Sequence, residues 1–167
     1  MDINIFMQKQ HIGKAICAGL TAKSLNKSEK KCTGKIKIND SLYADRNNEK
    51  LLISKQKLQL LKSKYKNLGI ATGRPKSEAE YVIKNNKLEK IFDCIIALED
   101  VVNSKPAPDS LLAVINNLNL KQTIYIGDSP NDVLAAKSAN IPSIYVGKQN
   151  VGTIKFQNIL KVIKYLL

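Results

Sequence analysis

The chain has 167 residues, 44% of them hydrophobic, and a formal net charge of +13. This length predicts one domain of ordinary size, and the apolar content is too high for a disordered protein. No apolar run reaches the roughly 18 residues of a membrane-spanning helix, and the first residues lack the basic start and apolar core of a secretory signal, so we expect no membrane partner.

The positive charge is almost entirely lysine, which supplies 25 of the 27 basic residues. Proteins that read nucleic acids favour the rigid fork of arginine, so nucleic acid is not an expected partner. Residues 1–66 carry 15 basic and 5 acidic side chains, whereas residues 67–167 carry 12 and 9. We therefore divide the chain into a lysine-rich N-terminal segment, residues 1–50, and an α/β core, residues 51–167.

Cysteine and histidine usage limits both the compartment and the metal chemistry. Three cysteines, Cys17, Cys32 and Cys94, give an odd count and no disulfide framework, which predicts a reducing compartment and a cytoplasmic protein. The chain has a single histidine, His11, so a zinc site built from cysteine and histidine is not expected.

The N-terminal part has a weak structural pattern. Residues 1–20 are compatible with a short helix, and residues 21–37 combine many lysines with Ser, Thr, Asn and Gly, as in a solvated segment. The alternation of polar and apolar residues at 35–38 predicts a short strand. An amphipathic helix is predicted over residues 55–66.

From residue 68 onward, apolar runs alternate with stretches of helical spacing. Pro75 predicts the start of one helix, a stripe of apolar residues over 111–118 predicts a second, and residues 152–167 predict a closing helix. This alternation is typical of βαβ units in a parallel sheet. The predicted strands cover residues 68–72, 94–98, 123–126 and 143–146.

Polar residues follow these runs at the edge where open α/β sheets bind ligands. Thr72, Gly73 and Arg74 follow the first strand, Lys105 lies one loop after the second, and Asp128 and Asp132 follow the third. A hydroxyl and a lysine suit phosphate, and two carboxylates four residues apart suit an oxygen-ligated cation such as Mg²⁺.

In order and spacing, Thr72-Gly73-Arg74, Lys105-Pro106 and Gly127-Asp128 with Asp132 resemble motifs II, III and IV of the haloacid dehalogenase (HAD) superfamily. The resemblance covers roughly residues 50–148 and is to the phosphatase branch with a helical cap, similar to subfamily IA. It implies a Rossmann-like parallel sheet with flanking helices.

The resemblance also implies roles for individual residues. Thr72 would hydrogen-bond the transferring phosphoryl group together with Gly73 and Arg74 as substrate-binding residues, and Lys105 would offset its charge. Asp128 would ligate Mg²⁺, and Asp132 would orient the water of the metal or share in its ligation. Gly127 would allow a sharp turn where a side chain would crowd the site.

One family motif is missing from the sequence. Motif I, an Asp-x-Asp after an N-terminal strand, supplies the nucleophile and the general acid in the family, but no Asp-x-Asp follows Asp2, Asp40 or Asp45. That strand lies at the centre of the family's sheet. We therefore expect another segment to replace it, with residues 35–38 as the best local candidate, or the two neighbouring strands to close the gap. The third alternative is an incomplete reading frame. Otherwise residues 1–50 would be a cap remnant.

Three functions follow from these observations. The first is a Mg²⁺-dependent phosphatase acting on a small phosphomonoester, whose competence as an enzyme the missing motif leaves undecided. The second is a non-catalytic relative that binds phosphate ligands or a partner protein. The third and weakest is lysine-driven nucleic-acid binding.

Simpler interpretations exist for each candidate residue. Asp128 and Asp132 are also compatible with a helix N-cap and a first-turn carboxylate. Arg74 is spaced to pair with Glu78 four residues on, and a lone lysine such as Lys105 is commonly a solvated surface residue.

Overall fold

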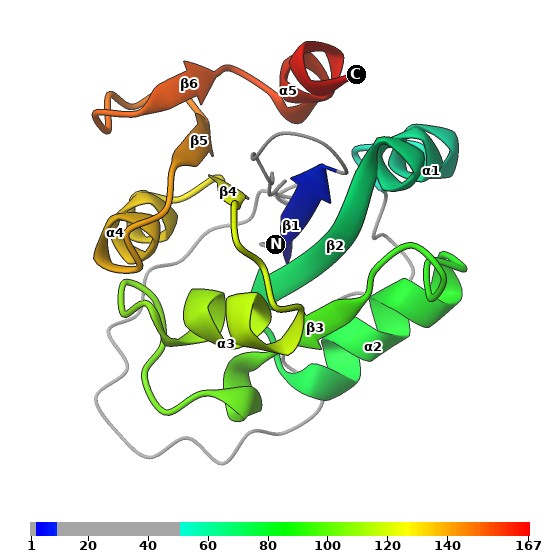
Figure 1. Cartoon of the computed structure of the whole chain (residues 1–167), viewed down its shortest axis with the longest axis horizontal. Coiled ribbons are helices and arrows are strands. Elements are labelled where there is room, and N and C mark those ends of the chain that lie inside the picture. Colours follow the sequence, from blue (N-terminus) through cyan, green and yellow to red (C-terminus); the bar gives the residue numbers. More distant parts are fainter. Residues whose placement is uncertain (1–2, 10–50) are drawn as a thin grey trace, which may run out of the picture.

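The computed structural model describes the backbone of residues 3–9 and the whole of residues 51–167. These residues form a six-stranded sheet in the order β3-β2-β1-β4-β5-β6 (Figure 1). The strands are β1 (Ile3–Lys9), β2 (Tyr65–Thr72), β3 (Cys94–Ile96), β4 (Ile124–Gly127), β5 (Ser143–Val146) and β6 (Ile154–Phe156).

The helices surround this sheet and cover its apolar strands (Figure 1). They are α1 (Lys55–Lys64), α2 (Lys76–Asn85), α3 (Asp109–Asn117), α4 (Pro130–Ser138) and α5 (Ile159–Leu166). Helix α1 packs on β2, α3 on β2 and β3, α4 on β4 and β5, and α5 on β6. The sequence therefore has the α/β fold that its alternating pattern predicts.

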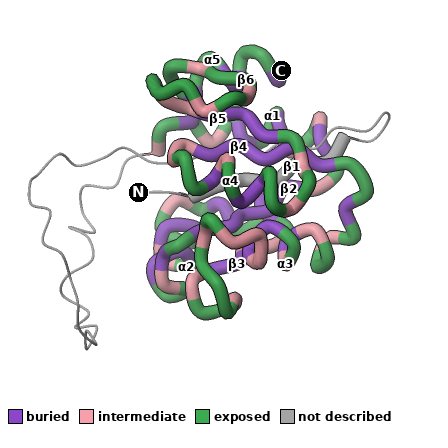
Figure 2. The backbone as a smooth tube through the Cα atoms, turned by 90° about the vertical axis from the view of Figure 1, so that its left-hand side faces the viewer, coloured by how far each residue is buried: buried purple, intermediate pink, exposed green. Residues whose placement is uncertain are grey.

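The central strands are continuous apolar runs because they are buried in the core. Strand β4 is buried along its whole length, and β2 is buried from Leu68 to Thr72, as expected for strands covered on both faces. Figure 2 shows these buried positions running through the middle of the molecule. Helices contribute fully buried side chains from the outside, among them Leu58, Leu61, Leu111 and Val114.

The central position of the sheet is filled by β1, not by the candidate at residues 35–38, which lies outside the described residues. Strand β1 pairs with both β2 and β4, and it runs antiparallel to both. The remaining pairs, β2 with β3, β4 with β5 and β5 with β6, are parallel. The prediction of a helix within residues 1–20 is thus wrong for residues 3–9, which contain β-favouring Ile and Phe residues.

The C-terminal segment also differs from its prediction. In place of one helix over residues 152–167, the edge strand β6 comes first, and α5 begins only at Ile159. The Asn158 side chain caps α5 by accepting a hydrogen bond from the Lys161 backbone N–H at 3.0 Å, and this cap separates the strand from the helix. The predicted strand at 94–98 is shorter than expected, because residues 98–100 form a 3₁₀ turn.

Helix length bears on the membrane question. No helix in the described part of the chain is long and apolar enough to cross a bilayer.

Candidate functional site at the carboxyl edge of the sheet

The loop after β4 is organised around Asp132, in the first turn of α4. Ser129 is the N-cap, and its hydroxyl accepts a hydrogen bond from the Asp132 backbone N–H at 3.2 Å. In return, Asp132 Oδ2 accepts from the Ser129 N–H at 3.0 Å and from the Ser129 hydroxyl at 2.8 Å. This reciprocal capping box satisfies backbone donors that a helix start would otherwise leave unpaired.

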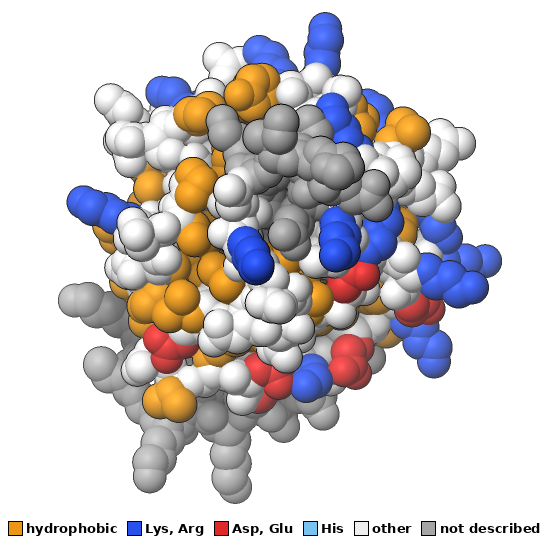
Figure 3. Space-filling model, viewed as in Figure 1, with side chains coloured by type: hydrophobic (Ala, Val, Ile, Leu, Met, Phe, Trp, Pro, Cys, Tyr) orange, Lys and Arg blue, Asp and Glu red, His pale blue; other side chains and the backbone are white. Residues whose placement is uncertain are grey.

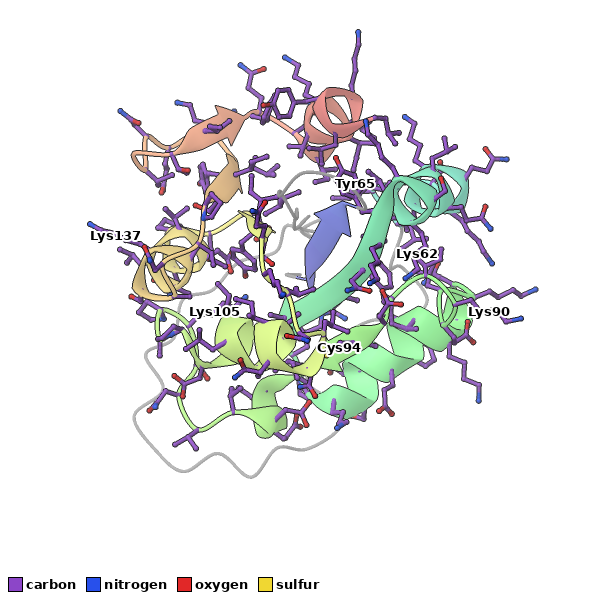
Figure 4. All side chains as sticks on the ribbon, in the orientation of Figure 1. Lys62, Tyr65, Lys90, Cys94, Lys105 and Lys137 are labelled. Atoms are coloured by element: carbon purple, nitrogen blue, oxygen red, sulfur yellow. The ribbon has the colours of Figure 1, made fainter. Side chains whose placement is uncertain are left out.

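The same carboxylate reaches back to the strand and across to the neighbouring loop. Asp132 Oδ1 accepts from Lys105 Nζ at 2.8 Å and from the Tyr125 hydroxyl at 2.7 Å. Lys105 Nζ also donates to the Tyr125 oxygen at 3.2 Å. One buried carboxylate therefore joins three elements: β4, the start of α4 and the loop before α3. Lys105, from that loop, is labelled in Figure 4.

Burial makes this ion pair different from one on the surface. The side chain of Lys105 is 11% exposed and that of Asp132 is 1% exposed. Burial alone would raise the pKa of Asp132, but the charge of Lys105 and the hydrogen bonds from Lys105, Tyr125 and Ser129 outweigh it and hold the pKa below its ordinary value. Lys105 is thus held in place by an ion pair with a buried carboxylate, and it is not a solvated surface lysine.

Gly127 is required by the close approach of Asp132. A Cβ atom at position 127 would lie 2.2 Å from the Asp132 Cβ and 2.8 Å from its Oδ2, far inside van der Waals contact. A side chain at position 127 would thus collide with Asp132. Glycine in this position lets the carboxylate lie directly against the end of β4.

Thr72 and Asp128 lie at the same level of the sheet on either side of β1. Ile5 pairs with Ile70 on one side and with Ile126 on the other. Continuing two residues along each strand brings Thr72 and Asp128 to the same height. With β1 between them, β2 and β4 are about 10 Å apart at the usual strand spacing, so the two strands present their polar ends to one region.

The backbone after Thr72 folds back onto its hydroxyl. Thr72 is buried, and its Oγ1 accepts a hydrogen bond from the Arg74 backbone N–H at 3.1 Å. Arg74 is 6% exposed, with its Nη1 4.0 Å from Glu78 Oε2. The pairing of Arg74 with Glu78 expected from their spacing is confirmed, and it places this guanidinium charge inside the molecule beside the end of β2.

The Asp132 carboxylate is surrounded by hydrogen-bond donors. Five donors, from Lys105, Tyr125, Ser129 and the Asp128 backbone, already occupy the Asp132 oxygens, and a carboxylate has about four lone-pair sites. Asp132 is therefore poorly placed for the metal ligation that the family resemblance implied for it. No group of three or more His, Cys, Asp or Glu ligands occurs among the described residues.

Two members of the network were not anticipated. Tyr125 lies inside an apolar strand, where its ring resembles any other core residue, and only its position three residues before Asp128 distinguishes it. Ser129, and not Asp128, is the N-cap of α4. A serine directly before Pro130, with an acidic residue three positions on, is a helix-start pattern that sequence reasoning could have used.

Sequence comparisons identify relatives for part of the chain. The phosphoglycolate phosphatase of Escherichia coli (strain K12) is 36% identical over 89 residues, 52% of this chain and 35% of that protein. The phosphoglycolate phosphatase of Salmonella choleraesuis (strain SC-B67) is 37% identical over 79 residues, 46% of this chain and 31% of that protein. The chain thus matches about a third of the length of these curated relatives.

Solved structures and a family model complete the comparison. A HAD-superfamily hydrolase from Ehrlichia chaffeensis has a TM-score of 0.64 at 26% identity, over 75% of this chain and 61% of that one. A HAD phosphatase from Thermococcus onnurineus has a TM-score of 0.62 at 25% identity, over 72% and 60%. The sequence model of the haloacid dehalogenase-like hydrolases matches residues 15–146. The chain belongs to this family.

Proposed function

We propose that this chain is a metal-dependent phosphatase whose substrate is a small phosphomonoester bound at the carboxyl edge of β2 and β4. The observation that carries the proposal is the ion pair between Lys105 and the buried Asp132, which lies at the end of β4, across β1 from the end of β2 at Thr72. A fixed cation next to a carboxylate that suits a metal is the arrangement that charge compensation in phosphoryl transfer requires.

Each residue has a part in holding the phosphoryl group. The Thr72 hydroxyl donates to one phosphoryl oxygen, Gly73 and Arg74 form the adjoining wall, and Lys105 offsets the negative charge from the other side. Asp132 fixes the position of Lys105 through its 2.8 Å contact. Asp128 would hold Mg²⁺, and the bound metal would withdraw charge from the phosphoryl oxygens.

The relatives indicate which substrate to test first. The E. coli and Salmonella proteins are phosphoglycolate phosphatases, so we infer phosphoglycolate, or a phosphomonoester of similar size, as the substrate. Hydrolysis breaks the ester P–O bond and transfers the phosphoryl group to water.

The test is hydrolysis of p-nitrophenyl phosphate and of phosphoglycolate with Mg²⁺. We expect Asp128→Asn to lower kcat/KM by about 100-fold or more, because the amide removes the anionic metal ligand. Glu80→Gln is the matched control, since Glu80 is an exposed carboxylate on α2, and it should leave the rate unchanged. Turnover that survives Asp128→Asn would contradict the proposed site.

The sequence around the central strand suggests a second function to test, although the comparisons support the phosphatase. No Asp-x-Asp occurs in the chain, and β1 presents its amino end at this edge, because Ile3 pairs with Thr72. A non-catalytic protein that binds phosphate through the same residues would bind inorganic phosphate and Mg²⁺ in calorimetry without hydrolysing either ester. Measuring binding and turnover on the same preparation separates the two functions.

A further inference from the structure

A cavity lies at the opposite edge of the sheet from the candidate phosphatase site. It has a volume of about 630 Å³ and is lined mainly by α1 and by the segment between α2 and β3. Both segments precede the strands that they lead into, so the cavity lies at the amino ends of β2 and β3. A cavity of this volume is in the range of small-molecule sites.

The lining of this cavity is strongly basic. Lys55, Lys62, Lys87 and Lys90 line it, and Glu89 is the only acidic residue among the described residues that do so. Lys62 is paired with Asp93, but no acidic group in residues 51–167 lies within ion-pair distance of the other three lysines. Figure 3 shows basic side chains gathered on this side of the molecule, and Figure 4 labels Lys62 and Lys90.

Lys87 is held in a backbone conformation that lysine disfavours. Three helices end in the same way, with the residue after the C-cap at positive φ: Asn119 at 47° after α3, Asn140 at 55° after α4, and Lys87 at 53° after α2. Glycine and asparagine are the usual residues here. Lysine at this one position gives up backbone preference and places an ammonium group at the cavity, as is common for strained residues at functional sites.

We propose that this cavity binds a small polyanion with two or more linked phosphoryl groups through Lys55, Lys87 and Lys90. These three lysines line one cavity and have no acidic partner at ion-pair distance within residues 51–167, so a ligand with several negative charges would offset their combined charge. Lys55 is the first residue of α1, where the positive end of the helix dipole adds to the attraction. Inorganic triphosphate and nucleoside diphosphates share this chemistry, and a single phosphate would meet only part of it.

The experiment is calorimetric titration of the full chain with tripolyphosphate, in EDTA so that metal ions do not contribute. Lys87→Asn is the decisive variant, because asparagine suits the positive-φ position. We expect affinity to fall by about three- to tenfold while the Tm stays the same or rises. Lys90→Gln should weaken binding to a similar extent, and titration with ADP should show the same order of affinities if nucleotides are the source.

Two controls distinguish binding in this cavity from general attraction to a basic surface and from binding at the phosphatase site. Lys155→Gln removes an exposed lysine on β6, at the far end of the sheet, and should leave the affinity unchanged. Lys105→Gln, or Thr72→Ala if the first variant does not fold, tests binding at the phosphatase site and should also leave it unchanged. The proposal is overturned if wild-type chain does not bind, if Lys155→Gln weakens binding as much as Lys87→Asn, or if only the Lys105 or Thr72 variant abolishes it.

Discussion

The carboxylate of Asp132 is almost wholly removed from solvent, yet it stays ionised at neutral pH because it is surrounded by donors. Lys105 and Tyr125 hold one oxygen, and Ser129 and the Asp128 backbone hold the other. Such a residue has two functions at once, since it completes the capping box of α4 and fixes the Lys105 ammonium at the carboxyl edge. Its loss would therefore disturb both the loop and the site.

The depressed pKa of Asp132 predicts how stability depends on pH. Above the unfolded pKa, about 3.9, the carboxylate is ionised in both states and its stabilisation is fully present. As the pH falls through the lower folded pKa, the folded state also takes up the proton and the stabilisation is lost. We expect Asp132→Asn to reduce the free energy of unfolding at pH 7 by about 3–5 kcal/mol, because Lys105 would lose its buried partner.

Urea denaturation at several pH values measures this effect. The difference between wild type and Asp132→Asn should be largest near neutral pH and should shrink below about pH 4. Glu80→Gln, on the exposed face of α2, serves as the control and should show little difference at any pH. A constant difference down to pH 2 would mean that the ion pair does not supply the stabilisation.

Gly127 gives a steric prediction at the same place. Gly127→Ala would put a methyl carbon 2.2 Å from the Asp132 Cβ, so Asp132 or the strand end has to move, at a cost of about 1–3 kcal/mol. Gly73→Ala is the matched control, because no atom lies within 4 Å of a Cβ there. Its unfolding free energy should change by less than about 1 kcal/mol. Equal effects in thermal unfolding would contradict the close packing at position 127.

At the level of elements, the sequence indicated the strands that alternate with helices and missed those that do not. Strands β2, β4 and β5 appear as buried apolar runs, whereas β1 is a short run next to a lysine-rich segment, and β6 contains a lysine between two apolar residues. Periodicity describes burial on both faces of a strand. Periodicity does not indicate the direction of a strand, so it could not predict that β1 runs antiparallel to its neighbours.

The position of β1 predicts how much the fold depends on it. Ile5 pairs with β2 on one side and with β4 on the other, so Ile5→Pro removes a ladder N–H at the centre of the sheet, at a cost of about 3 kcal/mol or more. Ile154→Pro is the control, because Ile154 is the first residue of the edge strand β6, where proline is tolerated. Circular dichroism and urea unfolding of both variants test this difference, and similar losses would argue against β1 as a central strand.

For the molecule as a whole, the predicted fold class agrees with the family match and with the similar solved structures. The ordered motifs could be recognised because each follows a strand, and parallel strands bring their carboxyl ends to one edge. The basic cavity at the other edge could not be predicted from the sequence. Its residues come from α1 and from the loop before β3, and no regular spacing in the sequence links the two segments. The net charge of the chain did not indicate where lysines would cluster on the surface. In particular, it did not indicate the cluster whose members have no acidic partner within residues 51–167.

The reversed strand in the middle has a consequence for the order of assembly. The half-sheets β3-β2 and β4-β5-β6 are each built from segments that are close in the chain, but they become one hydrogen-bonded sheet only through the pairing of residues 5–7 with residues 124–126. Contacts between such distant segments form slowly, since loop closure precedes any gain from pairing. We therefore expect the two halves to collapse first and the insertion of the N-terminal residues to limit the refolding rate.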